Sequence, residues 1–428
     1  MRYFSTRDKS KSNPFSLADA AFAGLAPDGG LFMPERIPEV DMERVMAEAE
    51  KSYADMALYL AQLLFDDVPQ DKLEAVVRGA YDFPVDLCNV GDDYFTLQLF
   101  HGPTYAFKDF GARFMGRMTG LLNDEGPLTI LTATSGDTGS AVAHGFYGVD
   151  GVRVVVLYPE GKVSPLQEAQ MTTLDGNIHP LRVKGNFDDC QRLVKSMFRD
   201  VELRRDVRVT SANSINILRW IPQAFYYFYG YCVWRKMTGR EEMEVVVPSG
   251  NYGNLTAGML AKSMGLPIKG FVAASNANDV VPEFLRTEVY SPRASVHTVA
   301  NAMDVGDPSN FERMMYLCGD DVALLKSLVK GYSYSDDEIL SAISEMKERY
   351  GYLSDPHSAV GYLATKDSGC DGFWLSTAHA AKFSEITKQA TMEDAPIPER
   401  LSEMMTRERK YDSIEADESV LAAYLREK

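Results

Sequence analysis

The spacing of apolar residues predicts a helical region near the start of the chain. Within residues 41–79, apolar side chains recur every three or four positions, as at Met56, Leu60 and Leu64, which is the spacing of one face of a helix. The stretch before it, residues 24–34, is rich in glycine and proline and predicts turns. Together these segments predict a small, mainly helical N-terminal domain.

A different rhythm begins at Leu128, where short apolar runs alternate with helical patterns. The predicted strands are residues 128–133, 153–158, 178–183, 244–248, 269–274 and 372–376, and the predicted helices are residues 140–147, 165–174, 187–198, 255–264 and 336–350. Strands alternating with helices indicate βαβ units and parallel sheets covered on both faces. Because the units fall into two separated blocks, we predict an α/β fold of two open, twisted parallel sheets with a ligand cleft between them.

Composition narrows the possible functions. The chain has 428 residues and a formal net charge of −17, which argues against binding nucleic acid. The N-terminal residues lack the apolar core of a signal peptide, and no run of about 18 apolar residues occurs; we expect a cytoplasmic protein without membrane contact. The five cysteines show no CxxC spacing, and the histidines, including His357, show no metal-binding pattern. We therefore predict no metal site.

The first candidate for chemistry is Lys108, which lies between two phenylalanines in the segment Phe100–Gly111. Lysine is seldom buried without a function, and desolvation lowers the pKa of an amine, as a nucleophilic or Schiff-base lysine requires. Taken alone, the same pattern is also typical of a surface lysine that extends its charge into solvent, or of one paired with Asp109.

Two loops rich in small residues follow predicted strands and precede predicted helices. One is Thr134–Gly139 and the other is Val247–Asn254. Backbone N–H groups at such turns bind phosphate or carboxylate at the helix N-terminus, although a single loop of this kind also serves as an ordinary helix cap. Neither loop has the GxGxxG or GxxxxGK[ST] pattern, which disfavours NAD and ATP.

Thr377 ends the predicted strand 372–376, at the carboxyl edge where open sheets bind ligands. Its hydroxyl suits a hydrogen bond to a ring nitrogen, and it suits equally well a cap for the next helix. Two anion-binding loops and a candidate amine form a constellation, to which this hydroxyl adds a further polar group.

In this order the segments resemble those of threonine synthases, in particular the longer class with its own N-terminal domain. The resemblance covers nearly the whole chain, and the pattern around Lys108 is its most specific part. The matching segments are residues 16–20, 24–32, 101–109, 135–139, 213–219, 248–254 and 377–379. The resemblance implies the tryptophan-synthase-β fold, called fold type II, of enzymes that use pyridoxal 5′-phosphate (PLP).

The resemblance also implies a role for each matching residue. Lys108 would hold PLP as a Schiff base and act as the catalytic residue. The cofactor-binding residues would be Lys108, Gly250, Asn251, Tyr252, Gly253, Asn254 and Thr377, with Thr377 facing the pyridine nitrogen. The substrate-binding residues would be Ser135, Gly136, Asp137, Thr138 and Gly139 for the carboxylate, and Asn213, Ser214, Asn216 and Arg219 for the phosphate. Arginine can grip a phosphate with two hydrogen bonds.

Family membership would make the chain a lyase of threonine biosynthesis. It would convert the small-molecule substrate O-phospho-L-homoserine and water into L-threonine and phosphate, by β,γ-elimination followed by addition of water at Cβ. The expected domains are residues 1–85, a large PLP-binding domain of 86–110 and 230–385, a small domain of 111–229 with the substrate loops, and a C-terminal segment, 386–428. We expect a monomer.

Two positions depart from the family pattern: Asn254 stands where the family often has Asp, and Ala380 where it usually has Pro. Neither change removes a group that the chemistry needs. The alternatives are a phospholyase or a serine/threonine dehydratase-type PLP lyase on the same fold and, from another class, an α/β binding protein without catalytic activity. A phospholyase would give 2-oxobutyrate and ammonia, whereas the binding protein would bind no PLP.

Overall fold

The computed structural model describes residues 1–427. Its N-terminal region pairs two short strands, β1 (Tyr3–Ser5) and β2 (Phe32–Pro34), in antiparallel fashion. The helices of this region are α1 (Leu17–Ala23), α2 (Met42–Lys51), α3 (Tyr53–Leu64) and α4 (Gln70–Ala80). The helical prediction for residues 41–79 is confirmed, but as three helices. Ser52 is extended and caps α3 by accepting a hydrogen bond from the backbone of Asp55, which separates α2 from α3.

The larger sheet has six strands in the order β11-β10-β9-β12-β4-β3. Its strands are β3 (Asp86–Gly91), β4 (Tyr94–Gln98), β9 (Met243–Pro248), β10 (Ile268–Ser275), β11 (Val329–Ser333) and β12 (Gly372–Ser376). The predicted strands at β9, β10 and β12 are confirmed. The edge strand β3 runs antiparallel to β4, so this sheet is not wholly parallel, whereas the other neighbours pair in parallel.

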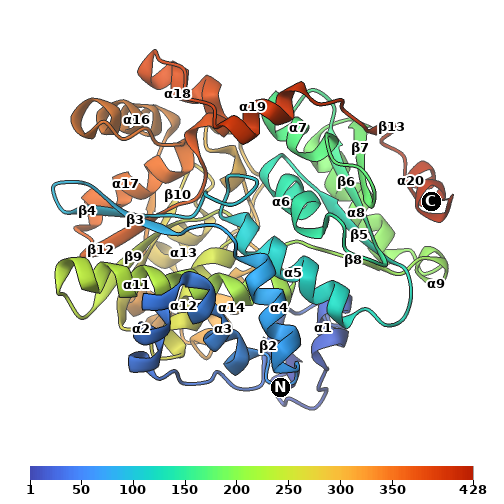
Figure 1. Ribbon diagram of the computed structural model, residues 1–428, viewed down its shortest axis with the longest axis horizontal. Coiled ribbons are helices and arrows are strands. Elements are labelled where there is room, and N and C mark those ends of the chain that lie inside the picture. The colour runs from blue at the N-terminus through green and yellow to red at the C-terminus, as the bar shows by residue number, and fades with distance from the viewer. Residues whose placement is uncertain (428) are drawn as a thin grey trace.

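Helices cover both faces of this sheet (Figure 1), with α11 and α12 on one side and α16 and α17 on the other. Successive valines of β9 accordingly enter different cores, because side chains alternate along a strand. The helices in this part of the chain are α11 (Ala224–Thr238), α12 (Gly253–Ser263), α13 (Val280–Thr287), α14 (Phe311–Leu317), α15 (Val322–Leu328), α16 (Asp336–Tyr350), α17 (Pro356–Ser368), α18 (Ser384–Thr391) and α19 (Glu399–Thr406), with 3₁₀ turns η2 (Asn301–Met303) and η3 (Ala380–Phe383).

The smaller sheet has five parallel strands in the order β13-β7-β6-β5-β8. They are β5 (Leu128–Ala133), β6 (Val152–Pro159), β7 (Ile178–Lys184), β8 (Val209–Thr210) and β13 (Asp412–Glu415). The helices are α5 (Lys108–Leu122), α6 (Asp137–Phe146), α7 (Pro165–Thr172), α8 (Phe187–Arg199), α9 (Leu203–Asp206), α10 (Ile217–Trp220) with the turn η1 (Ile221–Gln223), and α20 (Glu418–Glu427). The end of the chain thus supplies the edge strand of a sheet that begins with β5.

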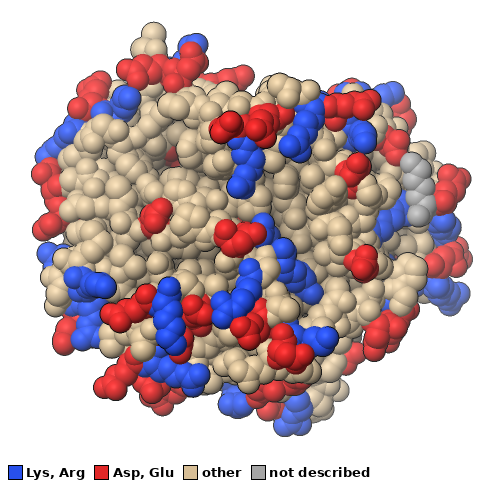
Figure 2. Space-filling model, viewed as in Figure 1, with Lys and Arg blue, Asp and Glu red and all other residues tan. Residues whose placement is uncertain are grey.

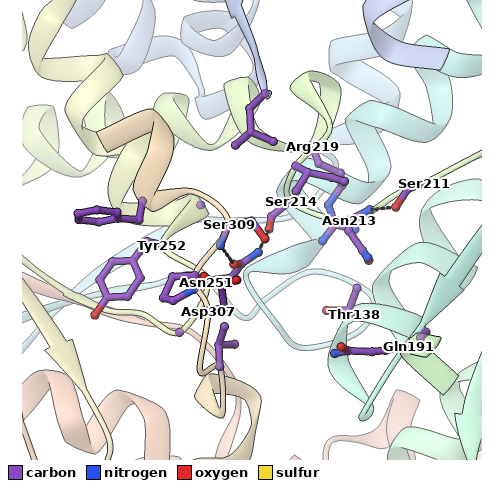
Figure 3. Close-up of a pocket in the computed structure, with 18 of the residues that line it drawn as sticks. Thr138, Gln191, Ser211, Asn213, Ser214, Arg219, Asn251, Tyr252, Asp307 and Ser309 are labelled. Carbon is purple, nitrogen blue, oxygen red and sulfur yellow. Dashed lines mark hydrogen bonds between the residues drawn. The ribbon is translucent and has the colours of Figure 1, made fainter. Parts of the chain in front are cut away.

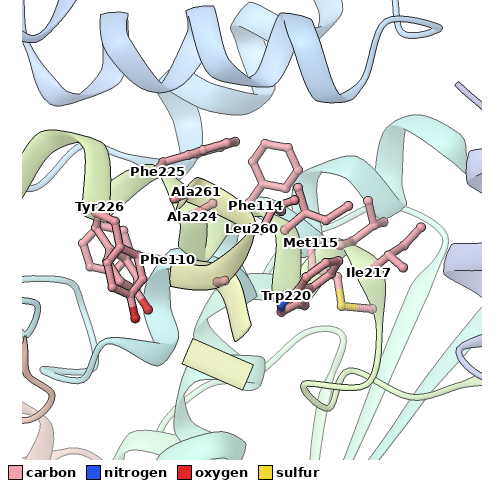
Figure 4. Close-up of a cluster of buried hydrophobic side chains, with 14 of the residues drawn as sticks. Phe110, Phe114, Met115, Ile217, Trp220, Ala224, Phe225, Tyr226, Leu260 and Ala261 are labelled. Carbon is pink, nitrogen blue, oxygen red and sulfur yellow. The ribbon is translucent and has the colours of Figure 1, made fainter. Parts of the chain in front are cut away.

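The largest core joins the N-terminal region to both sheets. At its centre, aromatic and aliphatic side chains of α5, α10, α11 and α12 pack together, among them Phe110, Phe114, Trp220 and Phe225 (Figure 4). Helices α5 and α12 are therefore anchored to one buried cluster, which restrains the segments that lead into each helix.

The surface carries both signs of charge. On the face drawn in Figure 2, acidic and basic side chains are interspersed around the rim, without a large area of one sign. Across residues 1–427 no helix has the length and apolar character needed to span a membrane.

Candidate active site

A cavity of about 2200 Å³ lies between the two sheets and is lined by residues from both and from the N-terminal region. Most of the residues singled out in the sequence line it: Lys108, Ser135, Asp137, Thr138, Asn213, Ser214, Arg219, Gly250, Asn251, Tyr252, Gly253, Asn254 and Thr377. Segments far apart in the chain are thus brought to one place, as expected for the carboxyl edges of parallel strands.

Lys108 is the first residue of α5, and backbone hydrogen bonds tie its segment to Thr377. The N–H of Phe107 donates to the carbonyl of Thr377 at 2.8 Å, and the N–H of His379 donates to the carbonyl of Tyr105 at 3.1 Å. The amine and the threonine therefore keep a fixed relation, although they lie far apart in the sequence.

The environment of Lys108 favours a neutral amine. Its side chain is 15% exposed, and burial lowers the pKa of Lys108, with Lys382 and Arg219 acting in the same direction and Asp137 against it. A helix N-terminus also disfavours a positive charge. The interpretation of Lys108 as an ordinary surface lysine does not fit this burial, and Asp109 does not pair with it, since its carboxylate accepts from the N–H and hydroxyl of Thr104.

The segment Gly250–Asn254, called the Gly250–Asn254 loop here, follows β9 and includes the first two residues of α12. Hydrogen bonds from several neighbouring segments hold its conformation. Tyr252 has a left-handed backbone, with φ of 58°, and its buried hydroxyl is 2.6 Å from that of Ser275. Asn251 donates to Ser214 at 2.8 Å and accepts from the backbone of Ser309 at 2.6 Å (Figure 3). The first backbone N–H groups of α12 lack partners within the helix and suit an anion.

Asn254 stands at the position where the family often has Asp, and its amide holds the loop. It accepts from the hydroxyl of Ser249 at 2.7 Å and donates to the carbonyl of Pro248 at 2.8 Å. Only an amide can make the second bond, because an ionised carboxylate has no donor.

Hydrogen bonds within the turn Thr134–Gly139 hold part of its backbone. The hydroxyl of Thr134 accepts from the N–H of Gly136 at 2.9 Å and from that of Gly139 at 2.8 Å, and neither glycine lines the cavity. The N–H groups of Gly136 and Gly139 therefore hold the turn itself, and the contact of these residues with the substrate stays a prediction. The backbone of Gly136 has a φ of 144°, a conformation that glycine adopts readily and other residues rarely do. Ser135, Asp137 and Thr138 do face the cavity, and the N–H groups of the latter two begin α6.

The segment 211–219 places Asn213, Ser214 and Arg219 at the cavity and Asn216 away from it. The side chain of Asn216 is buried, donates to the carbonyl of Ala21 at 2.7 Å and caps α10. Both ends of its amide thus bind the protein, and its contact with the substrate stays a prediction.

Arg219 is a buried guanidinium with unused donors. It donates to the carbonyl of Ala212 at 2.9 Å, and its Nε has no hydrogen-bond partner among residues 1–427. Burial lowers the pKa of Arg219 to about 10, so it stays charged at neutral pH. A buried cation with free donors beside a cavity is suited to bind an anion.

Sequence reasoning missed several residues at the cavity. The N-terminal segment contributes Thr6 and Arg7, and the segment before α14 contributes residues 301–309. His357 also faces the cavity; its Nε2 accepts from the N–H of Ala302 at 3.0 Å, and its Nδ1 lies 2.8 Å from Asp355. The Asp355-Pro-His357 sequence was the only pattern in the sequence that pointed to His357 and its contacts.

The side chains at the cavity fit PLP. An amine in a largely buried position, a helix N-terminus for a phosphate and the hydroxyl of Thr377 are all present. That hydroxyl makes no hydrogen bond within the described residues, while the N–H of Thr377 donates to Ser358 at 3.1 Å. A neutral hydroxyl can hydrogen-bond a pyridine nitrogen without favouring its full protonation.

Comparisons with known proteins agree with this site. Three family models match: threonine synthase N terminus over residues 2–81, pyridoxal-phosphate dependent enzyme over 89–372, and threonine synthase C-terminal over 358–425. The chain is 44% identical to threonine synthase of Serratia marcescens, covering 94% of each sequence. The crystal structure of threonine synthase from Escherichia coli superposes with a TM-score of 0.90, 42% identity and 99% coverage of both chains. The crystal structure of PLP-bound threonine synthase from Brucella melitensis superposes with a TM-score of 0.93 and 34% identity, covering 100% of this chain and 99% of that one.

Proposed function

Because this chain belongs to the threonine synthase family, we propose that it converts O-phospho-L-homoserine and water into L-threonine and phosphate at the cavity around Lys108. The chain is a PLP-dependent lyase with the fold type II architecture. The observation that carries the site assignment is the convergence of Lys108, the Gly250–Asn254 loop, Thr377 and Arg219 on one cavity. PLP, when bound, stabilises the negative charge left at the substrate Cα by serving as an electron sink.

Lys108 would hold the cofactor through its amine, and the same amine would serve as the base once the substrate is bound. Its Nζ then accepts the proton from Cα and serves the later proton transfers of phosphate elimination. Because burial lowers the pKa of Lys108, the neutral amine that can accept a proton is favoured. Water adds at Cβ to give threonine.

The remaining residues bind and orient the substrate. Ser135, Thr138 and the first N–H groups of α6 receive the carboxylate, while Asn213, Ser214 and Arg219 receive the phosphate that leaves. The buried guanidinium of Arg219 supports this division, because it can compensate the negative charge of a leaving phosphate in a site of low polarity. The Gly250–Asn254 loop binds the cofactor phosphate, and Thr377 faces the pyridine nitrogen.

The sheet topology supports the predicted large domain, residues 86–110 with 230–385, and the small domain, 111–229, with one change. We propose that the C-terminal segment from α19 onward is part of the small domain, because α19 packs against α7, β13 pairs with β7 and α20 packs against α8.

Incubation with O-phospho-L-homoserine and identification of the products test the proposed function. L-Threonine and phosphate in equal amounts are the expected result. Formation of 2-oxobutyrate and ammonia would identify a phospholyase or dehydratase instead. A protein that binds no PLP would be an α/β binding protein without catalytic activity. The Lys108→Ala variant should form no product, which separates the site from a contaminating activity.

A further inference from the structure

A second lysine lies buried beside Lys108. Lys382 belongs to the 3₁₀ turn η3, shortly after Thr377, and its side chain is fully buried. Its Nζ lies 2.6 Å from Oδ1 of Asp137 and donates to the carbonyl of Thr104 at 2.8 Å. Lysine is almost never fully buried unless it is paired, so the pair with Asp137 accounts for its placement.

Asp137 stands between the two lysines, at the first position of α6. Its Oδ1 accepts from Lys382 and also from Nε2 of Gln167 at 3.0 Å. Its Oδ2 lies 3.7 Å from Nζ of Lys108, too far for a hydrogen bond. The carboxylate thus makes its close contacts on the side away from Lys108.

This division matters because a buried carboxylate beside a single amine would hold that amine as an ammonium ion. An ammonium ion cannot accept a proton or attack a carbonyl. We propose that Lys382 is a positioning residue for the reaction, which holds the Asp137 carboxylate and so leaves the Lys108 amine free to exchange protons with the substrate. The catalytic role of Lys108 rests on the proposed function. The effect of Lys382 on the protonation of the Lys108 amine does not depend on that function.

The charges around the three groups agree with this arrangement. Lys108 faces Asp137 of α6, Lys382 of η3, Arg219 of α10 and Asp355 before α17. Burial lowers the pKa of Lys108 despite the neighbouring carboxylate. Burial acts to raise the pKa of Asp137, but the two lysines outweigh it and hold that pKa well below its usual range, with a smaller contribution from His357.

The test measures the Lys108 amine directly, in the full-length protein freed of cofactor. Trace labelling with acetic anhydride over a range of pH, read by mass spectrometry of the Lys108 peptide, gives the pH at which the amine is half protonated. In Lys382→Met, this midpoint should rise by about one pH unit or more. Lys382→Arg keeps the charge and should keep the midpoint near that of the unsubstituted protein.

A second background separates an effect through Asp137 from direct repulsion between the lysines. Asp137→Asn alone should lower the Lys108 midpoint, and adding Lys382→Met should then change it far less than in the unsubstituted background. A midpoint unmoved by Lys382→Met, or a rise of equal size in the Asp137→Asn background, would overturn the proposal. Should Lys382→Met fail to fold, the Asp137→Asn variant alone decides. If its Lys108 midpoint does not fall, the carboxylate does not control the protonation of the amine, and the proposal is overturned.

Lys366→Met is a matched control, since it removes an ion-paired lysine, 2.8 Å from Glu345, that does not line the cavity. It should leave the Lys108 midpoint unchanged. With the cofactor restored, the pH profile of kcat in Lys382→Met should move to higher pH by the same amount as the labelling midpoint. Since labelling needs neither substrate nor product, it remains informative even if the enzyme proves to catalyse another elimination.

Discussion

Gly250 is the point at which the cofactor loop is most tightly constrained, and replacing it with alanine should weaken PLP binding. A Cβ atom there would lie 2.7 Å from Cα and 2.8 Å from the carbonyl oxygen of Met303. Ordinary contacts begin near 3.4 Å, so the loop or the facing turn must move by about 0.7 Å. The facing turn is not free to yield, because the N–H of Ala302 is hydrogen-bonded to His357.

Overpacking of this kind costs about 1–3 kcal/mol of free energy. We expect this cost in the PLP-bound form, because there the loop must fit the cofactor phosphate as well as the added methyl group. PLP affinity should then fall by about 5- to 150-fold. Titration of cofactor-free protein with PLP, followed by visible absorbance, measures this loss, and urea unfolding without PLP measures any loss of stability.

Gly270→Ala serves as the control, because its Cβ would meet the carbonyl of Leu328 at 3.1 Å in a strand that does not line the cavity. It should alter stability slightly and PLP affinity not at all. If Gly250→Ala bound PLP within twofold of the unsubstituted protein, the contact with Met303 would not restrain the loop, and the reasoning would be refuted.

Three further predictions concern other parts of the molecule. Lys108→Ala should lose both product formation and the visible absorbance of lysine-bound PLP; retention of either would exclude Lys108 as the attachment point. Arg219→Met should raise KM for O-phospho-L-homoserine by about tenfold or more, since a charge-assisted hydrogen bond contributes about 1.5–3 kcal/mol, with PLP affinity nearly unchanged; equal losses of both would contradict a substrate role. Burial lowers the pKa of His144 to about 4, below its unfolded value, so the unfolded chain binds the proton first and stability falls as pH decreases from about 6.5 toward 4. Between pH 7 and pH 5 this residue should cost about 2 kcal/mol in urea unfolding, a loss that His144→Gln should not show.

The βα units could be predicted because local sequence determines them. Short apolar runs such as Leu128–Ala133 end in turns of small residues, and the structure places strands and helices within a few residues of the predicted bounds. The position of β12 between β9 and β4 could not be predicted, since it depends on pairing between distant segments. The same holds for β13, whose four residues carry little pattern of their own.

The site could be predicted where a motif acts through its own backbone, as at Gly250–Asn254. The direction of each side chain could not be predicted: Asn213 faces the cavity, but Asn216 turns inward to cap α10. The role of Lys382 could not be predicted, because nothing in its local sequence indicates that Asp137, at the start of α6, would be its partner. Pairings between distant side chains are a property of the folded chain.

The placement of β13 has a consequence for the order in which the protein can fold during synthesis. The small sheet begins with β5 at Leu128, yet its last strand, Asp412–Glu415, leaves the ribosome only after the whole large sheet has been made. Until then β7 presents an unpaired edge, a form prone to associate with other chains. The nascent chain therefore carries this open edge until synthesis is almost complete, and loss of the residues after Thr406 should promote aggregation before it impairs chemistry.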